Sequence, residues 1–184
     1  TDNMLTLVTD RIDIATLARI GAVNERIMLN NPLLHRFFFS HVNWTRQEDD
    51  ERKAGFFIDT LELPKPAQFG FRVMSSWNRA RLLNRLLGFN TLVARQNEAL
   101  YATASAIGVV ISPQESPSAA LRAGMYIERL WLTATMLGLS IQPLTGVLYW
   151  AMRGRAGVHD GFSEQERVEI IRAYKGLDRI AAIG

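Results

Sequence analysis

One segment constrains the fold of this 184-residue chain more than any other: residues 116–138 predict a long helix with a broad apolar face. At ~1.5 Å per residue such a helix is roughly 33 Å long. Small and apolar residues recur along it at helical spacings: Ala120, Ala123, Gly124, Ile127, Leu130, Trp131, Ala134 and Leu137. Because the small residues in its first half permit close packing, we expect this helix to lie at the centre of the fold.

A buried strand is predicted immediately before this helix. Residues 102–112, ATASAIGVVIS, are mostly small or β-branched and carry no charge, which is typical of a strand buried on both faces. Apolar periodicity and capping residues predict further helices over residues 13–29, 31–44, 76–87, 145–152 and 163–175. We therefore expect an α/β (α+β) domain in which helices pack around a small mixed β-sheet.

Three stretches lack a clear helical pattern. Residues 45–53 are polar and acidic, so an exposed interruption is expected there. Residues 55–73 contain two prolines and two glycines, which favours an irregular lid or crossover. The last residues before Gly184 indicate the beginning of a strand. The chain is therefore expected to be a piece of a longer protein.

Composition narrows the class of protein. Cysteine is absent, which excludes disulfides and thiolate metal sites and favours a reducing compartment. The balance of 21 Lys and Arg against 18 Asp and Glu falls short of the concentrated basic face of a nucleic-acid-binding protein. No apolar run is long enough for a membrane span, and the first 25 residues are charged, unlike a signal peptide. A cytoplasmic protein without nucleic-acid or membrane partners is predicted.

The helix predicted over residues 76–87 is basic and amphipathic. Arg79, Arg81 and Arg85 alternate with leucines, and Gly88 follows as a helix end. We expect it to cover the core, with arginine stems shielding the leucines. Docking of this helix on a membrane surface or a nucleic acid is the alternative, although it lacks the aromatic and lysine content of such surfaces.

The residues indicate no catalytic machinery of a known kind. Phosphate-binding glycine loops, the GxSxG nucleophile motif and the HExxH metal motif are all missing from the sequence. His35, His41 and His159 lack ligand spacing, so we predict no metal site. For His35 and His41 an ordinary helix or helix-end position is favoured over a polar site residue. Any chemistry would therefore have to come from a cofactor.

The second half of the chain resembles the nitroreductase family. The resemblance rests on the strand AIGVVIS (106–112) and on AGMYIERLWLTATMLGLSIQPLTG (123–146), which reads as a helix with small residues at its start, a Gly-Leu end and a proline-containing loop. It covers residues 90–150. Trp44-Thr45-Arg46 and Asp59-Thr60-Leu61 resemble the lid of the divergent Acg-like relatives. On this resemblance the chain is one domain, with a helical part (1–54), a lid-like insertion with a helix (55–88) and a flavin-core half (90–184).

The resemblance implies a bacterial FMN-dependent NAD(P)H oxidoreductase that passes hydride through flavin N5 to a small, electron-poor acceptor. It also implies a homodimer, or a pseudo-dimer with a missing part of the chain. The expected cofactor-binding residues are Pro143, Leu144, Thr145 and Gly146. Thr145 can cap the following helix, whose free amides would face the ring. A tight turn without a ligand is the alternative for this loop.

The chain departs from the family pattern at its arginines. The Arg-x-Ser-x-Arg motif that grips the flavin phosphate and the Arg-x-Gly near the C-terminus are both missing. Arg153 and Arg155 could substitute, or could lie in a solvated loop. Arg122 and Arg129 share a side of the long helix and are expected in an interhelical or intersubunit ion pair, with binding of flavin phosphate or an acidic substrate as the alternative. These departures favour a second hypothesis, a catalytically degenerate flavin-binding, sensor or protein-interaction domain.

Overall fold

The computed structural model describes residues 4–158 and 161–183. In chain order its elements are β1 (Met4–Val8), α1 (Arg11–Asn30), α2 (Pro32–Ser40), β2 (Val42–Asn43), α3 (Arg46–Arg52), β3 (Phe56–Phe57), the 3-10 helix η1 (Ile58–Leu61), α4 (Lys65–Met74), α5 (Trp77–Leu87), α6 (Phe89–Tyr101), β4 (Ile107–Ile111), α7 (Pro117–Met136), α8 (Gly146–Arg155) and α9 (Glu164–Ile183). The α+β class expected from the sequence is confirmed.

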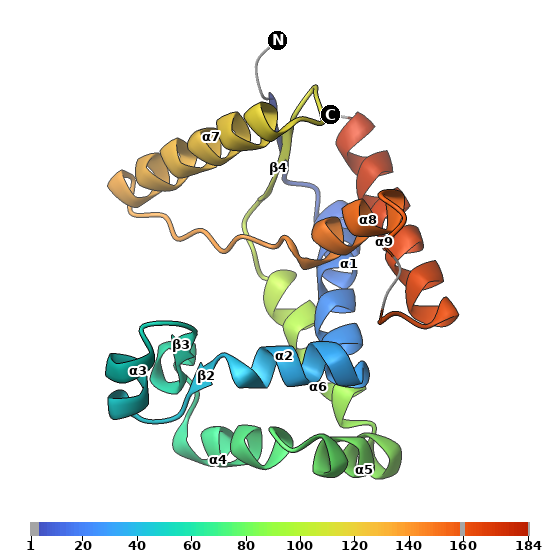
Figure 1. Cartoon of the computed structure of the whole chain (residues 1–184). Helices are drawn as coiled ribbons and strands as arrows, with labels where there is room; N and C mark the ends of the chain where they lie inside the picture. Colours follow the sequence, from blue (N-terminus) through green and yellow to red (C-terminus); the bar gives the residue numbers. More distant parts are fainter. Residues whose placement is uncertain (1–3, 159–160, 184) are drawn as a thin grey trace.

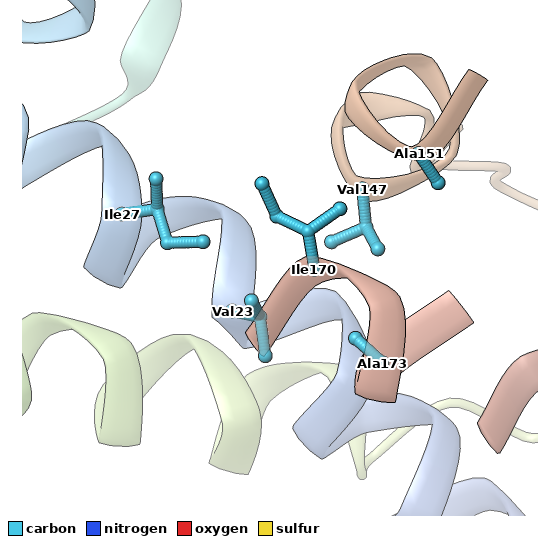
Figure 2. Packing of buried hydrophobic residues seen from close by; sticks show 6 residues of the cluster. All are labelled: Val23, Ile27, Val147, Ala151, Ile170 and Ala173. Carbon is cyan, nitrogen blue, oxygen red and sulfur yellow. The ribbon is translucent and has the colours of Figure 1, made fainter. Parts of the chain in front are cut away.

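Helix α1 is the centre of the fold (Figure 1). It begins after Asp10, whose carboxylate accepts from the amides of Ile12 and Asp13, and it packs against α6, α8 and α9. Figure 2 shows the cluster that joins α1, α8 and α9, made of Val23, Ile27, Val147, Ala151, Ile170 and Ala173. The position expected for the long apolar helix of residues 116–138 is therefore taken by α1.

The strands form two separate two-stranded ladders instead of one mixed sheet. Strands β1 and β4 pair antiparallel, with Met4 opposite Ile111 and Val8 opposite Ile107. Strands β2 and β3 form a short parallel pair elsewhere in the molecule. The expectation that residues 102–112 are buried on both faces is wrong: β4 is shorter, has one neighbouring strand and is mostly half-buried.

Residues 31–89 build a second core, here called the aromatic unit. Its buried members are Phe39, Val42, Ile58, Met74 and Ala80. Several partly buried rings pack around them: Phe38, Trp44, Phe56, Phe57, Phe71 and Phe89. Helices α2, α4 and α5, strands β2 and β3, and η1 therefore share one apolar cluster.

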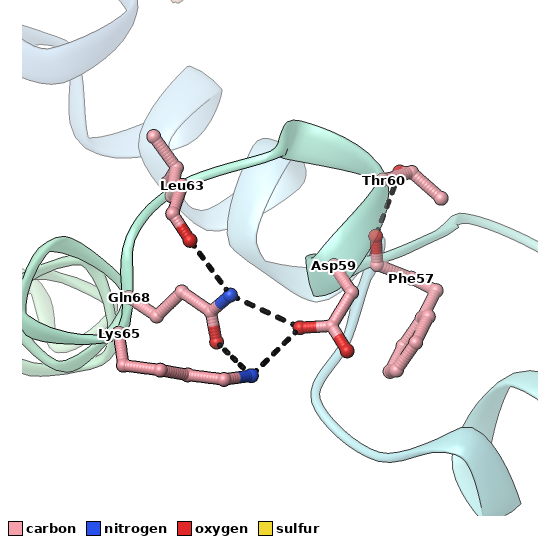
Figure 3. A network of polar contacts seen from close by, with 6 residues as sticks. All are labelled: Phe57, Asp59, Thr60, Leu63, Lys65 and Gln68. Carbon is pink, nitrogen blue, oxygen red and sulfur yellow. Dashed lines mark hydrogen bonds and ion pairs between the residues drawn. The ribbon is translucent and has the colours of Figure 1, made fainter.

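The two stretches predicted to be irregular, residues 45–53 and 55–73, contain helices α3 and α4. Thr45 and Glu48 form a capping box that starts α3, because each side chain bonds the backbone amide of the other. Helix α4 tolerates Pro66 in its first turn, where the missing N–H would have had no intrahelical acceptor. Lys65 and Gln68 both donate to Asp59, which ties α4 to η1 (Figure 3). The predicted lid is thus an ordered part of the aromatic unit.

Helix α5 covers the core, as expected, but most of its leucines are not shielded from solvent. Ala80 is buried and Leu83 packs against the aromatic cluster. Leu82, Leu86 and Leu87, by contrast, are 56%, 68% and 71% exposed. The arginine stems therefore do not shield these leucines from solvent.

Residues 112–145, here called the arm, leave the body of the chain. Ser116 caps α7 by accepting from the amide of Ala119, as a serine before a helix is expected to do. The helix lies against β4 near its start and then points away from the other helices (Figure 1). Its apolar residues are largely uncovered, with Leu132 at 60% and Met136 at 80% exposure. The predicted helix is present, whereas its predicted central position is wrong for the single chain.

The C-terminal part contains two helices, α8 and α9, with non-helical residues between them. Ser163 and Glu166 form a capping box before α9, because Glu166 Oε2 accepts from Ser163 N at 2.7 Å and Ser163 Oγ accepts from Glu166 N at 3.3 Å. Helix α9 continues to Ile183, so the strand expected at the end of the chain is not formed. Within residues 4–158 and 161–183, no helix combines the length and apolar character that crossing a bilayer requires.

Candidate functional site

The four predicted cofactor-binding residues lie where the arm returns to the body. Pro143, Leu144 and Thr145 are exposed in an irregular segment, and Gly146 begins α8. The amides of Leu144, Thr145 and Gly146 donate to no acceptor among the described residues. Thr145 occupies the N-cap position, but its side chain accepts no bond from the helix, so its predicted capping role is wrong. The helix start is left with free donors and a partial positive charge.

Two glycines let this segment approach α1 and α6. A Cβ on Gly21 would lie 3.2 Å from Leu144 Cδ1 and 3.3 Å from Tyr101 Cδ2, so both side chains pack against the bare backbone there. A Cβ on Gly146 would clash with the carboxamide of Asn24, whose Cγ would be 2.6 Å away. Asn24 therefore fills the space between α1 and the start of α8. A ligand could reach the start of α8 only from the side that faces away from α1.

A half-buried acid and a tyrosine lie beside this segment. Tyr101 Oη donates to Glu25 Oε1 at 3.0 Å, and Asn24 Nδ2 lies 3.4 Å from the same oxygen. Burial, and after it the negative charge of Glu25, raises the pKa of Tyr101 above its ordinary value of 10.0. The other oxygen, Glu25 Oε2, is buried without a hydrogen-bond partner in the described part of the chain.

Sequence reasoning missed this pair. Glu25 lies in α1 between the buried residues Val23 and Ile27, and four residues after Gly21, so Gly21 and Glu25 face the same side. A carboxylate inside an apolar helical pattern was the available signal. Its partner could not be inferred, because Tyr101 is more than seventy positions away in the sequence.

The arginines do not assemble a phosphate grip in the single chain. Arg155 pairs with Glu115 at 2.9 Å and lies over the Tyr174 ring, while Arg153 lies over Tyr149. The ion pair expected for Arg122 and Arg129 is not formed within residues 4–158 and 161–183, where both side chains are exposed. The segment 143–146 can thus offer amide donors to a neutral or partly negative acceptor. It has no cationic side chain that could bind a phosphate.

The histidines lie elsewhere. His35 is fully buried in the aromatic unit, where its Nε2 is 2.8 Å from the carbonyl oxygen of Met74. His41 Nδ1 lies 2.7 Å from the carbonyl oxygen of Phe37 at the end of α2. His159 falls outside the described residues. His35 therefore lies within a helix and His41 at a helix end, as expected, and neither belongs to the segment 143–146.

Two hollows on the described surface are lined by other residues. One, of about 190 Å³, opens between Trp44, Phe69 and Arg72 in the aromatic unit. The other, of about 330 Å³, lies between the end of α1 and the start of α9 and contains Glu166 and Glu169. The first is below the common size range of ligand pockets, and the carboxylates of the second oppose an anionic ligand. Neither includes Pro143, Leu144, Thr145 or Gly146.

Comparison with known proteins adds one relative without a described activity. The chain is 29% identical over 154 residues to the uncharacterized protein MT1398 of Mycobacterium tuberculosis. The match covers 82% of this chain and 21% of that protein, so the chain spans about a fifth of the relative's length. No family model matches the sequence. No solved structure matches it either.

Proposed function

We propose that this chain is part of an FMN-dependent NAD(P)H oxidoreductase of nitroreductase type, whose flavin site is completed by a second copy. The observation that carries the proposal is the exposed segment Pro143–Gly146, which presents free amides at the point where the uncovered arm rejoins the body. The acceptor would be a small, electron-poor molecule, with the protein acting in the cytoplasm and without nucleic-acid partners.

The exposed face of α7 supports a homodimer. Leu121, Met125, Leu132 and Met136 are all exposed on this helix, and a contiguous apolar surface of this extent marks an interaction site. A stable interface buries roughly 800 Å² on each partner, which a helix of 20 residues and its apolar continuation can provide. The exposed Arg122 and Arg129 would then find their carboxylate partners across the interface.

The amides suit one part of FMN and leave another part without a partner. Reduced flavin carries negative charge near N1 and the C2 carbonyl, and FMN would supply hydride chemistry at N5 when bound. The N–H groups of Leu144, Thr145 and Gly146 can stabilise that charge without reorganisation. The phosphate has no grip in this chain because Arg155 is paired with Glu115, so the second copy or the rest of the protein would hold it.

Reconstitution with FMN tests the proposal. Gly146→Ala brings a Cβ onto Asn24 and should displace the segment, so we expect at least a tenfold loss of FMN affinity by fluorescence titration. Gly70→Ala is the matched control, because a Cβ there meets nothing within 4 Å and the residue lies in α4, outside both the segment and α7. NAD(P)H should bleach the flavin bands of the wild-type complex. Equal FMN affinity of both variants, with the fold intact by circular dichroism, would place any flavin elsewhere.

A degenerate interaction module is the second candidate. It is favoured by the missing phosphate grip and by the Asn24 carboxamide against Gly146. A colourless protein that takes up no FMN at any concentration, yet sediments as a dimer, would decide for this candidate. Dimerisation alone supports both candidates, so the FMN titration is the measurement that separates them.

A further inference from the structure

The longest stretch without acidic residues lies in the aromatic unit and α6. Residues 63–97 contain Lys65 and five arginines and no Asp or Glu, in a chain that otherwise carries a near balance of charges. Arg81 and Arg85 form no ion pair within the described residues, and both side chains are exposed. The net charge of +3 is therefore unevenly distributed along the chain, because residues 63–97 carry six basic residues and no acidic one.

Helix α5 combines this charge with uncovered leucines. At about 100° per residue, Leu82 and Leu86 lie on the side opposite the buried Ala80. Arg79 flanks the two leucines on one side, and Arg81 and Arg85 flank them on the other. The exposed face thus has an apolar centre with basic edges, in contrast to an ordinary solvated face, whose centre is polar.

Helix α4 repeats the pattern. Phe69 is 72% exposed and lies on the same outward face as Arg72 and as Lys65, whose ammonium group is paired with Asp59 at 3.2 Å. The inward residues Met74 of α4 and Ala80 of α5 are buried in one cluster, so both helices cover the same core and turn their outer faces away from it. The two helices follow each other along one side of the molecule (Figure 1). Their outer faces carry aromatic and leucine residues among cations.

We infer that the outer faces of α4 and α5 dock on an anionic lipid surface. Helices that lie in the membrane interface place Phe and Leu in the acyl boundary and Lys and Arg at the headgroups, which is the arrangement seen here. A nucleic acid would contact the arginines but would leave Leu82 and Leu86 in water. This inference is independent of the flavin proposal. It replaces the expectation that no membrane is a partner with surface binding, which needs no spanning helix.

Vesicle sedimentation of the purified chain tests the inference. We expect binding to phosphatidylcholine vesicles that contain phosphatidylglycerol and little binding to phosphatidylcholine alone. Arg81→Gln/Arg85→Gln should weaken partitioning about 25-fold, at roughly fivefold for each cation near an anionic surface. Leu82→Ser/Leu86→Ser should weaken it at least tenfold. The matched controls are Arg172→Gln/Lys175→Gln and Ile12→Ser, which change exposed residues on α9 and α1 and should leave binding unchanged.

Three results would overturn the inference. One is the absence of binding to the anionic vesicles by a chain with native circular dichroism. Another is loss of binding in the α5 and control variants alike, which would indicate general electrostatic adsorption. A third is tight binding to duplex DNA that depends on Arg81 and Arg85 but not on Leu82 and Leu86, because a nucleic acid would then be the partner.

Discussion

The aromatic unit and the arm each contain a helix with a capping residue and an apolar face. Only the helix of the aromatic unit is covered by other parts of the chain. Asn31 caps α2 and Ser116 caps α7, and both helices carry an apolar face. Helix α2 buries Phe39 and His35, whereas α7 buries only Ala119 and Ala134. The comparison teaches that capping residues and apolar periodicity specify a helix. Whether its apolar face is buried depends on contacts with the rest of the chain or with a partner.

Aromatic contacts explain why the aromatic unit can pack by itself. The Phe39 ring lies 4.6 Å from His35, 5.0 Å from Phe71 and 6.4 Å from Trp44. Such pairs contribute about 0.5–1.5 kcal/mol each beyond their buried area. In the arm, Trp131 remains 43% exposed. The arm therefore gains its stability only when another surface covers it.

The largest effect is expected in the aromatic unit. Phe39→Ala should lower the free energy of unfolding by about 3–5 kcal/mol, because it removes a buried ring and leaves a cavity. Leu132→Ala in the arm should change it by no more than about 0.5 kcal/mol at dilutions where the chain is monomeric. Urea unfolding followed by circular dichroism measures both. Comparable losses would show that the arm is packed in the monomer, and the contrast would fail.

The second effect concerns the point where the arm meets the body. Gly146→Val should cost about 1–3 kcal/mol, because the added atoms clash with Asn24. In an Asn24→Ala background the same substitution should cost clearly less, since the carboxamide that it strikes is gone. A double-mutant cycle by urea unfolding gives this coupling. Additive costs would show that Asn24 does not restrain Gly146.

The aromatic unit should also carry a pH dependence that the arm lacks. Burial is the main cause that lowers the pKa of His35 below its ordinary value of 6.5, so folding favours the neutral ring. Stability from this group is fully present above pH 6.5 and is lost as the pH falls below it, by at most about 1.4 kcal/mol per pH unit. His35→Phe should abolish that part of the slope in unfolding curves between pH 7.5 and 5.5. An unchanged slope would assign the dependence to other groups.

Local sequence signals predicted much of the fold. Asn31, Ser116 and Ser163 stand at the starts of predicted helices and accept from their amides, and apolar periodicity predicted that residues 13–29 and 116–138 are helical. Helix α4 was missed because two prolines and two glycines suggested irregular backbone, although Pro66 falls where a proline is tolerated. Strand β1 was missed because its partner β4 lies about a hundred residues away. Pairing over that distance leaves no local signal.

The sequence predicted the segment of the candidate site that is continuous in the chain, but not its contacts with distant helices. Pro143–Gly146 does lie at an exposed helix start with free amides, which the order of residues indicated. The contacts with Asn24 and the Glu25–Tyr101 bond arise because α1 and α6 pack side by side, so they depend on tertiary structure. Thr145 has a side chain suited to capping, yet a suitable residue type does not by itself ensure the geometry that the bond requires.

The smallest effect separates local from global stability within the arm. Ser116→Ala removes the cap of α7 and should destabilise this helix by about 0.5–2 kcal/mol. Because the arm adds little to global unfolding of the monomer, the urea midpoint should hardly move, whereas amide hydrogen exchange across α7 should accelerate. Thr45→Ala, which removes the cap of α3 in the aromatic unit, is the matched control. A midpoint shift as large as that of Thr45→Ala would mean that the arm unfolds together with the body, and that a cover for α7 exists within the chain itself.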